Sequence, residues 1–185
     1  MDQKRSRSKA RRAGSSPKRA QAGASNTLAT GLSDELVREC IWRIFAISSN
    51  LDQIRRAWGA LLDISGPQWI ILMAIDHLDE GDGVAVKDVS SKLQVNATFI
   101  TTQSKLLEEA GLLRRIVSAL DARVVLMSFT EKARRELARL AARRRQINDL
   151  IFAGINQREL TELVSKLGLV RDGSRNAAAA LGAGS

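Results

Sequence analysis

Residues 96–123 combine side chains that suit recognition of an anionic partner. Short hydroxyl and amide side chains recur at helical spacing in the first half of this stretch, and arginines follow in the second half. Hydroxyls and amides can bond base edges or phosphates, an apolar ring can contact a thymine methyl group, and arginine suits a narrow, electronegative minor groove. The candidate DNA contacts are Asn96, Thr98, Phe99, Thr102, Gln103, Arg115, Asp121 and Arg123.

Asp121 lies two residues before Arg123, a spacing at which its carboxylate could orient the guanidinium bidentately. Two plainer interpretations stay open. The polar residues of 97–110 could simply be the solvated side of a surface helix, and the Asp–Arg pair could be a surface ion pair of little energetic value.

The charge distribution favours the same conclusion. The chain has a net charge of +9, and residues 1–25 hold eight Lys or Arg against one Asp. Residues 101–145 hold 11 basic and 5 acidic residues. Locally basic segments in an otherwise balanced chain indicate an anionic partner.

The elements that must position these residues can be predicted from periodicity and capping. Ser33 is a plausible N-cap for a helix of about 29 residues, longer than a small globule needs, so its apolar stripe predicts a partner helix. Ser65 and Gln68 have capping-box spacing at the start of a second helix. The remaining elements, in order, are a short run at 84–86, helices at 87–93 and 97–110, strands at 112–117 and 123–129 joined by a tip at 118–122, a long helix after Thr130, and a last helix from Asn156 to Leu167.

This order predicts a mainly α fold with a small β wing, a winged helix-turn-helix. In such a fold a short helix, here 87–93, braces a second helix whose N-terminal half enters the major groove. Ile100, Ser104 and Leu107 are expected to face the core, which leaves the polar side of the reader helix exposed.

Several other classes are disfavoured by composition. One cysteine, Cys40, and one histidine allow neither an internal disulfide nor an ordinary Cys/His zinc site, so we expect no metal and no cofactor. No apolar run has the length of a membrane span and no signal peptide is apparent, so a cytoplasmic protein is expected. The sequence contains neither a Gly-rich phosphate loop nor a recognisable Ser/His/Asp set, so no motif indicates an enzyme.

The motifs resemble those of the MarR family of bacterial transcription regulators. The resemblance covers residues 33–167 and rests on Ser65-Gly66-Pro67-Gln68-Trp69, Gly111-Leu112-Leu113-Arg114-Arg115, Asp121-Ala122-Arg123 and Phe129-Thr130-Glu131-Lys132. Phe129 and Ala133 depart from the usual Leu and Gly, which we interpret as packing differences. Residues 96–102 also resemble the branch of this family that controls aromatic-acid catabolism.

The resemblance implies a homodimer in which the terminal helices interlock and each protomer presents a reader helix and wing to half of a pseudo-palindromic DNA operator. The wing would place Arg123 in the minor groove, oriented by Asp121. Composition predicts a disordered basic tail at 1–27 and a flexible tail at 168–185. Between them, the resemblance implies an N-terminal dimerisation helix at 28–64, a DNA-binding domain at 65–129 and C-terminal dimerisation helices at 130–167.

The resemblance also implies control by a small molecule bound between the dimerisation helices and the winged domain. That effector would be an aromatic acid or its coenzyme A thioester, whose phosphates arginine suits. The candidate effector-binding residues are Ile54, Trp58, Trp69, Met73, His77, Arg55, Arg56, Arg143 and Arg144. Core packing for the apolar members and a solvated helix face for the arginines are the alternatives.

The sequence therefore predicts a ligand-responsive DNA-binding regulator, a repressor released from its operator by its effector. One alternative is an architectural DNA-binding dimer without an effector. Another is a redox-sensing regulator that uses Cys40, although buried packing of this thiol is the favoured interpretation. The basic tail could add non-specific phosphate contacts.

Overall fold

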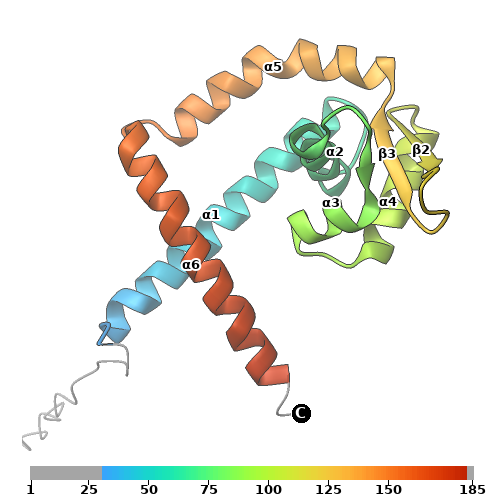
Figure 1. Ribbon diagram of the computed structural model, residues 1–185. Helices are drawn as coiled ribbons and strands as arrows, with labels where there is room; N and C mark the ends of the chain where they lie inside the picture. The colour runs from blue at the N-terminus through green and yellow to red at the C-terminus, as the bar shows by residue number, and fades with distance from the viewer. Residues whose placement is uncertain (1–30, 183–185) are drawn as a thin grey trace, which may run out of the picture. The chain divides into compact units, whose positions relative to one another are not determined.

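The computed structural model describes residues 31–182, so the predicted basic tail at 1–27 lies outside the described residues. The elements follow the predicted order (Figure 1). They are α1 (Asp34–Ala60), α2 (Gly66–Leu78), β1 (Val84–Ala85), α3 (Val86–Leu93), α4 (Ala97–Glu109), β2 (Leu113–Val117), β3 (Val125–Phe129), α5 (Glu131–Ile151) and α6 (Gln157–Gly182). The chain divides within α1 into two compact units, Met1–Gln53 and Ile54–Ser185.

The described part of the first unit is the N-terminal part of α1. The Ser33 hydroxyl accepts a hydrogen bond from the Leu36 backbone N–H at 3.4 Å, as expected of an N-cap. Large apolar side chains on this part of the helix are exposed, among them Leu36, Ile41, Trp42, Ile44, Phe45, Ile47 and Leu51. Cys40 is exposed as well, so the expectation of buried packing is wrong for the single chain, because Cys40 belongs to this uncovered apolar stretch.

The start of α2 is fixed by the capping box that the sequence predicts. The Gln68 N–H donates to the Ser65 hydroxyl at 3.3 Å, and the Ser65 N–H donates to the Gln68 side-chain oxygen at 2.8 Å. Two otherwise unpaired helix-end donors are thereby satisfied. The chain enters this cap from the end of α1, where the Ile64 N–H donates to the Gly59 carbonyl at 3.0 Å.

Three antiparallel strands form a small sheet in the order β1-β3-β2. The pairing of β2 with β3 runs from Leu113 opposite Phe129 to Val117 opposite Val125. The two-residue β1 pairs with the other edge of β3, where Val84 lies opposite Met127. The wing is thus joined by hydrogen bonds to the strand that precedes α3.

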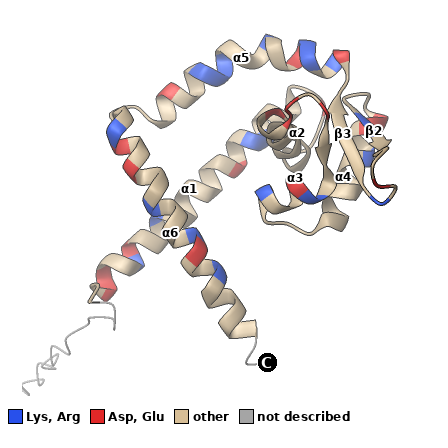
Figure 2. Ribbon diagram, in the orientation of Figure 1, with Lys and Arg blue, Asp and Glu red and all other residues tan. Residues whose placement is uncertain are grey.

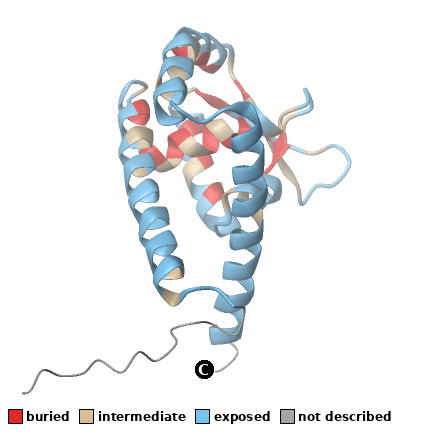
Figure 3. Cartoon of the chain, turned by 90° about the vertical axis from the view of Figure 1, so that its left-hand side faces the viewer, coloured by how far each residue is buried: buried red, intermediate tan, exposed pale blue. Residues whose placement is uncertain are grey.

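One hydrophobic core holds α2, α3, α4, the sheet and the first half of α5 together (Figure 3). Its fully buried members include Ile71, Leu72, Ile75, Val89, Ile100, Leu107, Leu112, Leu113 and Met127. The two departures from the family pattern, Phe129 and Ala133, are also buried, at 8% and 1% exposure. Their interpretation as packing residues is therefore confirmed.

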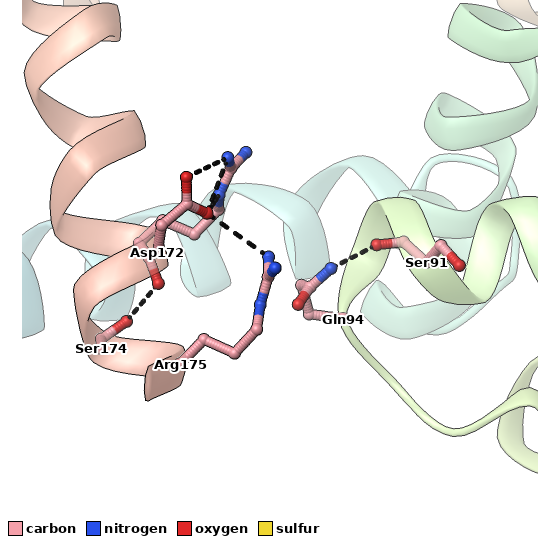
Figure 4. A network of polar contacts seen from close by, with 6 residues as sticks. Ser91, Gln94, Asp172, Ser174 and Arg175 are labelled. Atoms are coloured by element: carbon pink, nitrogen blue, oxygen red, sulfur yellow. Dashed lines mark hydrogen bonds and ion pairs between the residues drawn. The ribbon is translucent and has the colours of Figure 1, made fainter. Parts of the chain in front are cut away.

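The turn between α3 and α4 depends on a left-handed residue. Gln94 has φ 55° and ψ 43°, and its side-chain amide donates to the Ser91 carbonyl at 2.6 Å (Figure 4). The Ser90 hydroxyl donates to the Val95 carbonyl at 2.6 Å. The first contact uses a carbonyl group in the last turn of α3 and the second uses a carbonyl group of the turn itself, and together they make a short, defined turn.

The last helix is longer than predicted. Asn156 and Glu159 form the expected reciprocal cap, with N···O distances of 2.9 and 3.1 Å. The helix then continues to Gly182, so the expectation that it ends near Leu167 and gives way to a flexible tail is wrong for residues 168–182. The run Ala177–Ala180 explains the extension, since alanine has the highest helix propensity and Gly168 and Gly173 cost only about 1 kcal/mol each.

An exposed charge cluster lies on this C-terminal part of α6. The Arg171 guanidinium donates to the Asp172 carboxylate at 2.9 and 3.2 Å, and Arg175 lies 3.6 Å from the same carboxylate (Figure 4). The hydrogen bond from Arg171 lowers the pKa of Asp172 below its ordinary value. Because more than half of each of these side chains is exposed to solvent, the cluster adds little to stability.

Gly59 provides a test of the close approach between the end of α1 and the α2 cap. A Cβ at this position would lie 2.6 Å from the Ile64 carbonyl oxygen and 2.9 Å from the Ser65 backbone. Gly59→Ala should therefore lower the free energy of unfolding by about 1–3 kcal/mol, measured by urea denaturation with circular dichroism.

Gly173→Ala is the matched control, because nothing lies within 4 Å of its added Cβ. This change should instead raise the free energy of unfolding by about 0.5–1 kcal/mol through helix propensity. A Gly59→Ala protein as stable as the parent would contradict the close approach.

Candidate nucleic-acid interface

Helix α4 has one buried side and one exposed side. Ile100, Ser104 and Leu107 have 0% exposure, as the sequence predicts. Because these residues recur at helical spacing, the opposite side of α4 must face outward. The outward side includes the exposed Thr98, Phe99 and Thr102, whereas Gln103 is half-buried at the edge of the buried side, three residues after Ile100, so the expectation that it faces outward is wrong.

The N-terminus of α4 is capped and open to the surroundings. The Asn96 side-chain oxygen accepts from the Thr98 N–H at 2.7 Å, so this residue, predicted as a DNA contact, first of all holds the helix start. The Thr102 hydroxyl donates to the Thr98 carbonyl at 3.1 Å, which restrains its rotamer. A helix N-terminus with exposed hydroxyls suits a phosphate group.

The wing tip is folded by four hydrogen bonds within residues 118–124. The Ser118 N–H donates to the Val124 carbonyl at 2.8 Å, and the Val124 N–H donates to the Asp121 carbonyl at 2.9 Å. The Leu120 N–H donates to the Ser118 hydroxyl at 3.2 Å, and the Arg123 N–H donates to the Asp121 side-chain oxygen at 2.9 Å. The tip therefore has a defined backbone.

Asp121 binds the backbone of Arg123 rather than its guanidinium. Among the described residues no ion pair joins these two side chains, so the predicted bidentate contact is not formed in this structure. The two-residue spacing in a tight turn favours the local bond to the N–H. The Arg123 side chain stays exposed, beside a carboxylate that shapes the loop.

Arg115, which the sequence predicts as a DNA contact, has a side chain that is mostly buried. Its side chain is only 12% exposed; Arg115 Nη1 lies 3.9 Å from the Glu108 carboxylate, and Nε is buried without a hydrogen-bond partner. In β2, alternate residues face the same side of the strand, and Leu113 on that side is buried. Arg114, on the other side, is the exposed arginine of this strand.

Three residues that the sequence interpretation did not assign connect α4 to the wing and to α5. Glu108 accepts from the Arg115 N–H at 3.0 Å, the Thr130 hydroxyl donates to the Gly111 carbonyl at 2.7 Å, and Lys132 Nζ donates to the Ala110 carbonyl at 2.9 Å. In the sequence, the Thr-Glu-Lys motif indicates a helix start and the family resemblance, but not these contacts. Its spacing after a glycine helix end was the available signal for these contacts.

Four of the predicted effector residues meet in one cluster. The indoles of Trp58 and Trp69 stack with centroids 5.6 Å apart and an interplanar angle of 16°. The Arg143 guanidinium lies 5.9 Å from the centre of the Trp58 ring, and that of Arg144 lies 5.9 Å from the centre of Trp69. Arg144 also pairs with Asp76 at 3.5 Å. We refer to Trp58, Trp69, Arg143 and Arg144 as the tryptophan–arginine cluster.

The other predicted effector residues have separate surroundings. Ile54 and Met73 are half-buried and pack against the core. A Cβ on Gly66 would lie 3.0 Å from Arg56 Cγ and 3.3 Å from Arg55 Cγ, so both arginine stems cover the start of α2. His77 is exposed in the last turn of α2. The indoles are themselves buried, at 9% and 4% exposure, in line with the core-packing alternative.

Basic residues are prominent on the wing and along α5 (Figure 2).

Within residues 31–182, no group of three or more His, Cys, Asp or Glu side chains could hold a metal ion. No helix in that range is both long and apolar enough to cross a membrane.

Comparison with known proteins supports the interpretation of this region. Residues 62–124 match the MarR family. The HTH-type transcriptional regulator TtmR of Methylorubrum extorquens (strain PA1) is 31% identical over 93 residues, which cover 49% of this chain and 46% of that protein. The match thus spans about half the length of that curated relative.

Solved structures share the fold. A putative MarR-family regulator from Listeria monocytogenes, complexed with 26mer DNA, superimposes with a TM-score of 0.62 at 23% identity, covering 72% of this chain and 87% of that one. The S. aureus MepR–DNA complex gives a TM-score of 0.61 at 17% identity, covering 71% and 96%. Residues 62–124 are thus similar in sequence to the MarR family, and the chain shares the fold of these solved structures.

Proposed function

We propose that this protein is a DNA-binding transcription regulator that reads its operator with α4 and the wing. The observation that carries the proposal is the division of α4 into a buried apolar side and an exposed side bearing Thr98, Phe99 and Thr102. Such side chains suit base edges, phosphates and the thymine methyl group in a major groove. The solved DNA complexes of the same fold add support.

The wing supplies the second contact. Arg123 is exposed on a loop whose backbone is fixed by Asp121, so its guanidinium is available to a narrow minor groove. Arg114 is exposed on the same hairpin and suits a phosphate. Arg115, by contrast, acts through its contact with Glu108 and positions the hairpin on α4.

Arg123→Ala should weaken operator binding by about 1–3 kcal/mol, because the minor-groove contact is lost while the exposed side chain leaves the fold unchanged. The measurement is a fluorescence-anisotropy titration of duplex DNA from upstream of the gene.

Arg139→Ala is the control, since Arg139 is an exposed arginine already paired with Glu136 at 2.8 Å. It should change affinity much less than Arg123→Ala. If the parent and Arg123→Ala bind the duplex with equal affinity, the wing is not part of the DNA interface.

The functional unit in this proposal is a homodimer. The exposed apolar side chains of α1 include Trp42 and Phe45, whose rings lie 6.0 Å apart and are 65% and 63% exposed. Helix α6 also exposes Leu163, Val164 and Leu167. Such extended apolar faces favour association of two copies, which would also present two reader helices to a pseudo-palindromic operator.

Phe45→Asp should convert the dimer to a monomer, because it places a charge in the apolar face, and sedimentation velocity measures the change. Arg43→Ala is the matched control two residues away, where the arginine is 75% exposed and paired with Glu39. If Phe45→Asp sediments as the parent dimer does while its circular dichroism is unchanged, α1 is not the interface.

We further propose that the regulator is a repressor released by an aromatic acid or its coenzyme A thioester. The tryptophan–arginine cluster supports this effector class, since indoles suit an aromatic ring and guanidinium groups suit carboxylate or phosphate. Because the indoles are stacked and buried, an effector of this kind must separate or shift them. The cluster joins α5 to α2, so such a shift would move the DNA-binding elements.

The effector prediction is tested with the operator complex and aromatic acids or their thioesters at tens of micromolar. One of these compounds should release the DNA and change the fluorescence of Trp58 and Trp69, observed in a Trp42→Phe background. Arg143→Ala should weaken the response to that compound without changing DNA affinity in its absence. If no compound releases the DNA, the protein is an architectural or differently controlled DNA-binding dimer.

A further inference from the structure

The tip of the wing carries an apolar side chain that nothing in the described chain covers. Leu120 is 99% exposed, the highest value among the large hydrophobic residues of residues 31–182. It lies between Ser118 and Arg123 in the loop that joins β2 to β3. Transfer of a leucine side chain from water to an apolar surface is favourable, so a binding partner that covers Leu120 would gain free energy.

The loop presents Leu120 in a fixed position. Its own N–H donates to the Ser118 hydroxyl, while the Asp121 side chain accepts from the Arg123 N–H and the Asp121 carbonyl accepts from the Val124 N–H. The backbone on both sides of Leu120 is therefore restrained. Binding through this side chain would carry little additional cost of ordering the loop.

The shape and charge of the tip favour the minor groove of DNA as the partner. Ala119 and Ala122 are small, so Leu120 and Arg123 are the side chains that protrude from the tip. A hairpin end of this kind suits a groove about 6 Å wide. Arg123 draws the tip toward negative potential, and the Asp121 carboxylate is already bonded to the loop.

We propose that Leu120 is a specificity-determining residue that excludes guanine from the base step under the wing. The inference rests on the proposed operator binding. In the minor groove, A·T pairs present only acceptors, whereas G·C pairs add the guanine 2-amino group, which projects from the groove floor. A leucine pressed onto that floor blocks the amino group sterically and removes the water that it needs as a hydrogen-bond partner.

The experiment uses duplexes in which each flanking base pair of the operator is changed in turn to A·T, G·C or inosine·C. Inosine lacks the 2-amino group, so its pair resembles A·T in the minor groove and G·C in the major groove. At the step under the wing, G·C should weaken binding about tenfold and inosine·C should restore it, whereas contacts from α4 would respond to the major groove.

Leu120→Ala should reduce the G·C penalty at that step from about tenfold, which is the size expected for one base pair, to about twofold. Ala119→Ser is the control, a polar change at the neighbouring exposed residue that should leave the penalty intact. Because Leu120 is fully exposed, loss of folding is not expected to complicate the comparison.

Arg123→Ala separates failure of this inference from failure of the proposed function. If Arg123→Ala weakens binding while Leu120→Ala keeps the full G·C penalty, operator binding stands and the role of Leu120 is overturned. If inosine·C is as unfavourable as G·C, minor-groove exclusion is overturned as well. If the parent protein binds no duplex specifically, the proposed function fails and this inference fails with it.

Discussion

The arrangement of the winged helix depends on the burial of one side of α4. Ile100 and Leu107 have no exposure, and the sheet, α2 and α3 all pack around them. Since each turn of a helix rotates its side chains by a fixed angle, this burial decides which side chains face outward. The candidate DNA contacts are therefore positioned by buried residues, and a polar substitution in the core would misplace them all together.

The wing is held against this helix by contacts of a different kind. Glu108 at the end of α4 binds the backbone and guanidinium of Arg115, and Thr130 and Lys132 bind carbonyls where α4 ends. The Thr130 hydrogen bond is partly buried, where it gains from reduced competition with water, whereas the hydrogen bonds of Glu108 and Lys132 are exposed. They fix the distance between α4 and the wing, and in the proposed operator complex this distance would set how many base pairs separate the two groove contacts.

Sequence periodicity and capping were sufficient to predict the element order, the buried side of α4 and the caps at Ser65 and Asn156. Periodicity and capping were less informative where two neighbouring residues, or two possible hydrogen-bond partners, could serve the same function. Adjacent arginines at 114 and 115 share composition and charge, and only the strand alternation from buried Leu113 assigns Arg115 to the inner side. The choice of Asp121 between a guanidinium and a backbone N–H depends on loop geometry, which spacing alone does not specify. The length of α6 depends on small helix propensities summed over many residues. No single motif in residues 168–182 marks where the helix ends, so the sequence pattern did not predict its length.

The uncovered apolar side of α1 has a consequence for how the protein behaves in dilute solution. Its core, built around α2 and α4, does not include the exposed side chains of residues 36–51. If these are buried only when two copies associate, part of the folding free energy is supplied by mass action and rises with total protein concentration. The melting temperature of such a chain is not a constant of the sequence. It increases as such a protein accumulates, so at low concentration the same chain is also less stable.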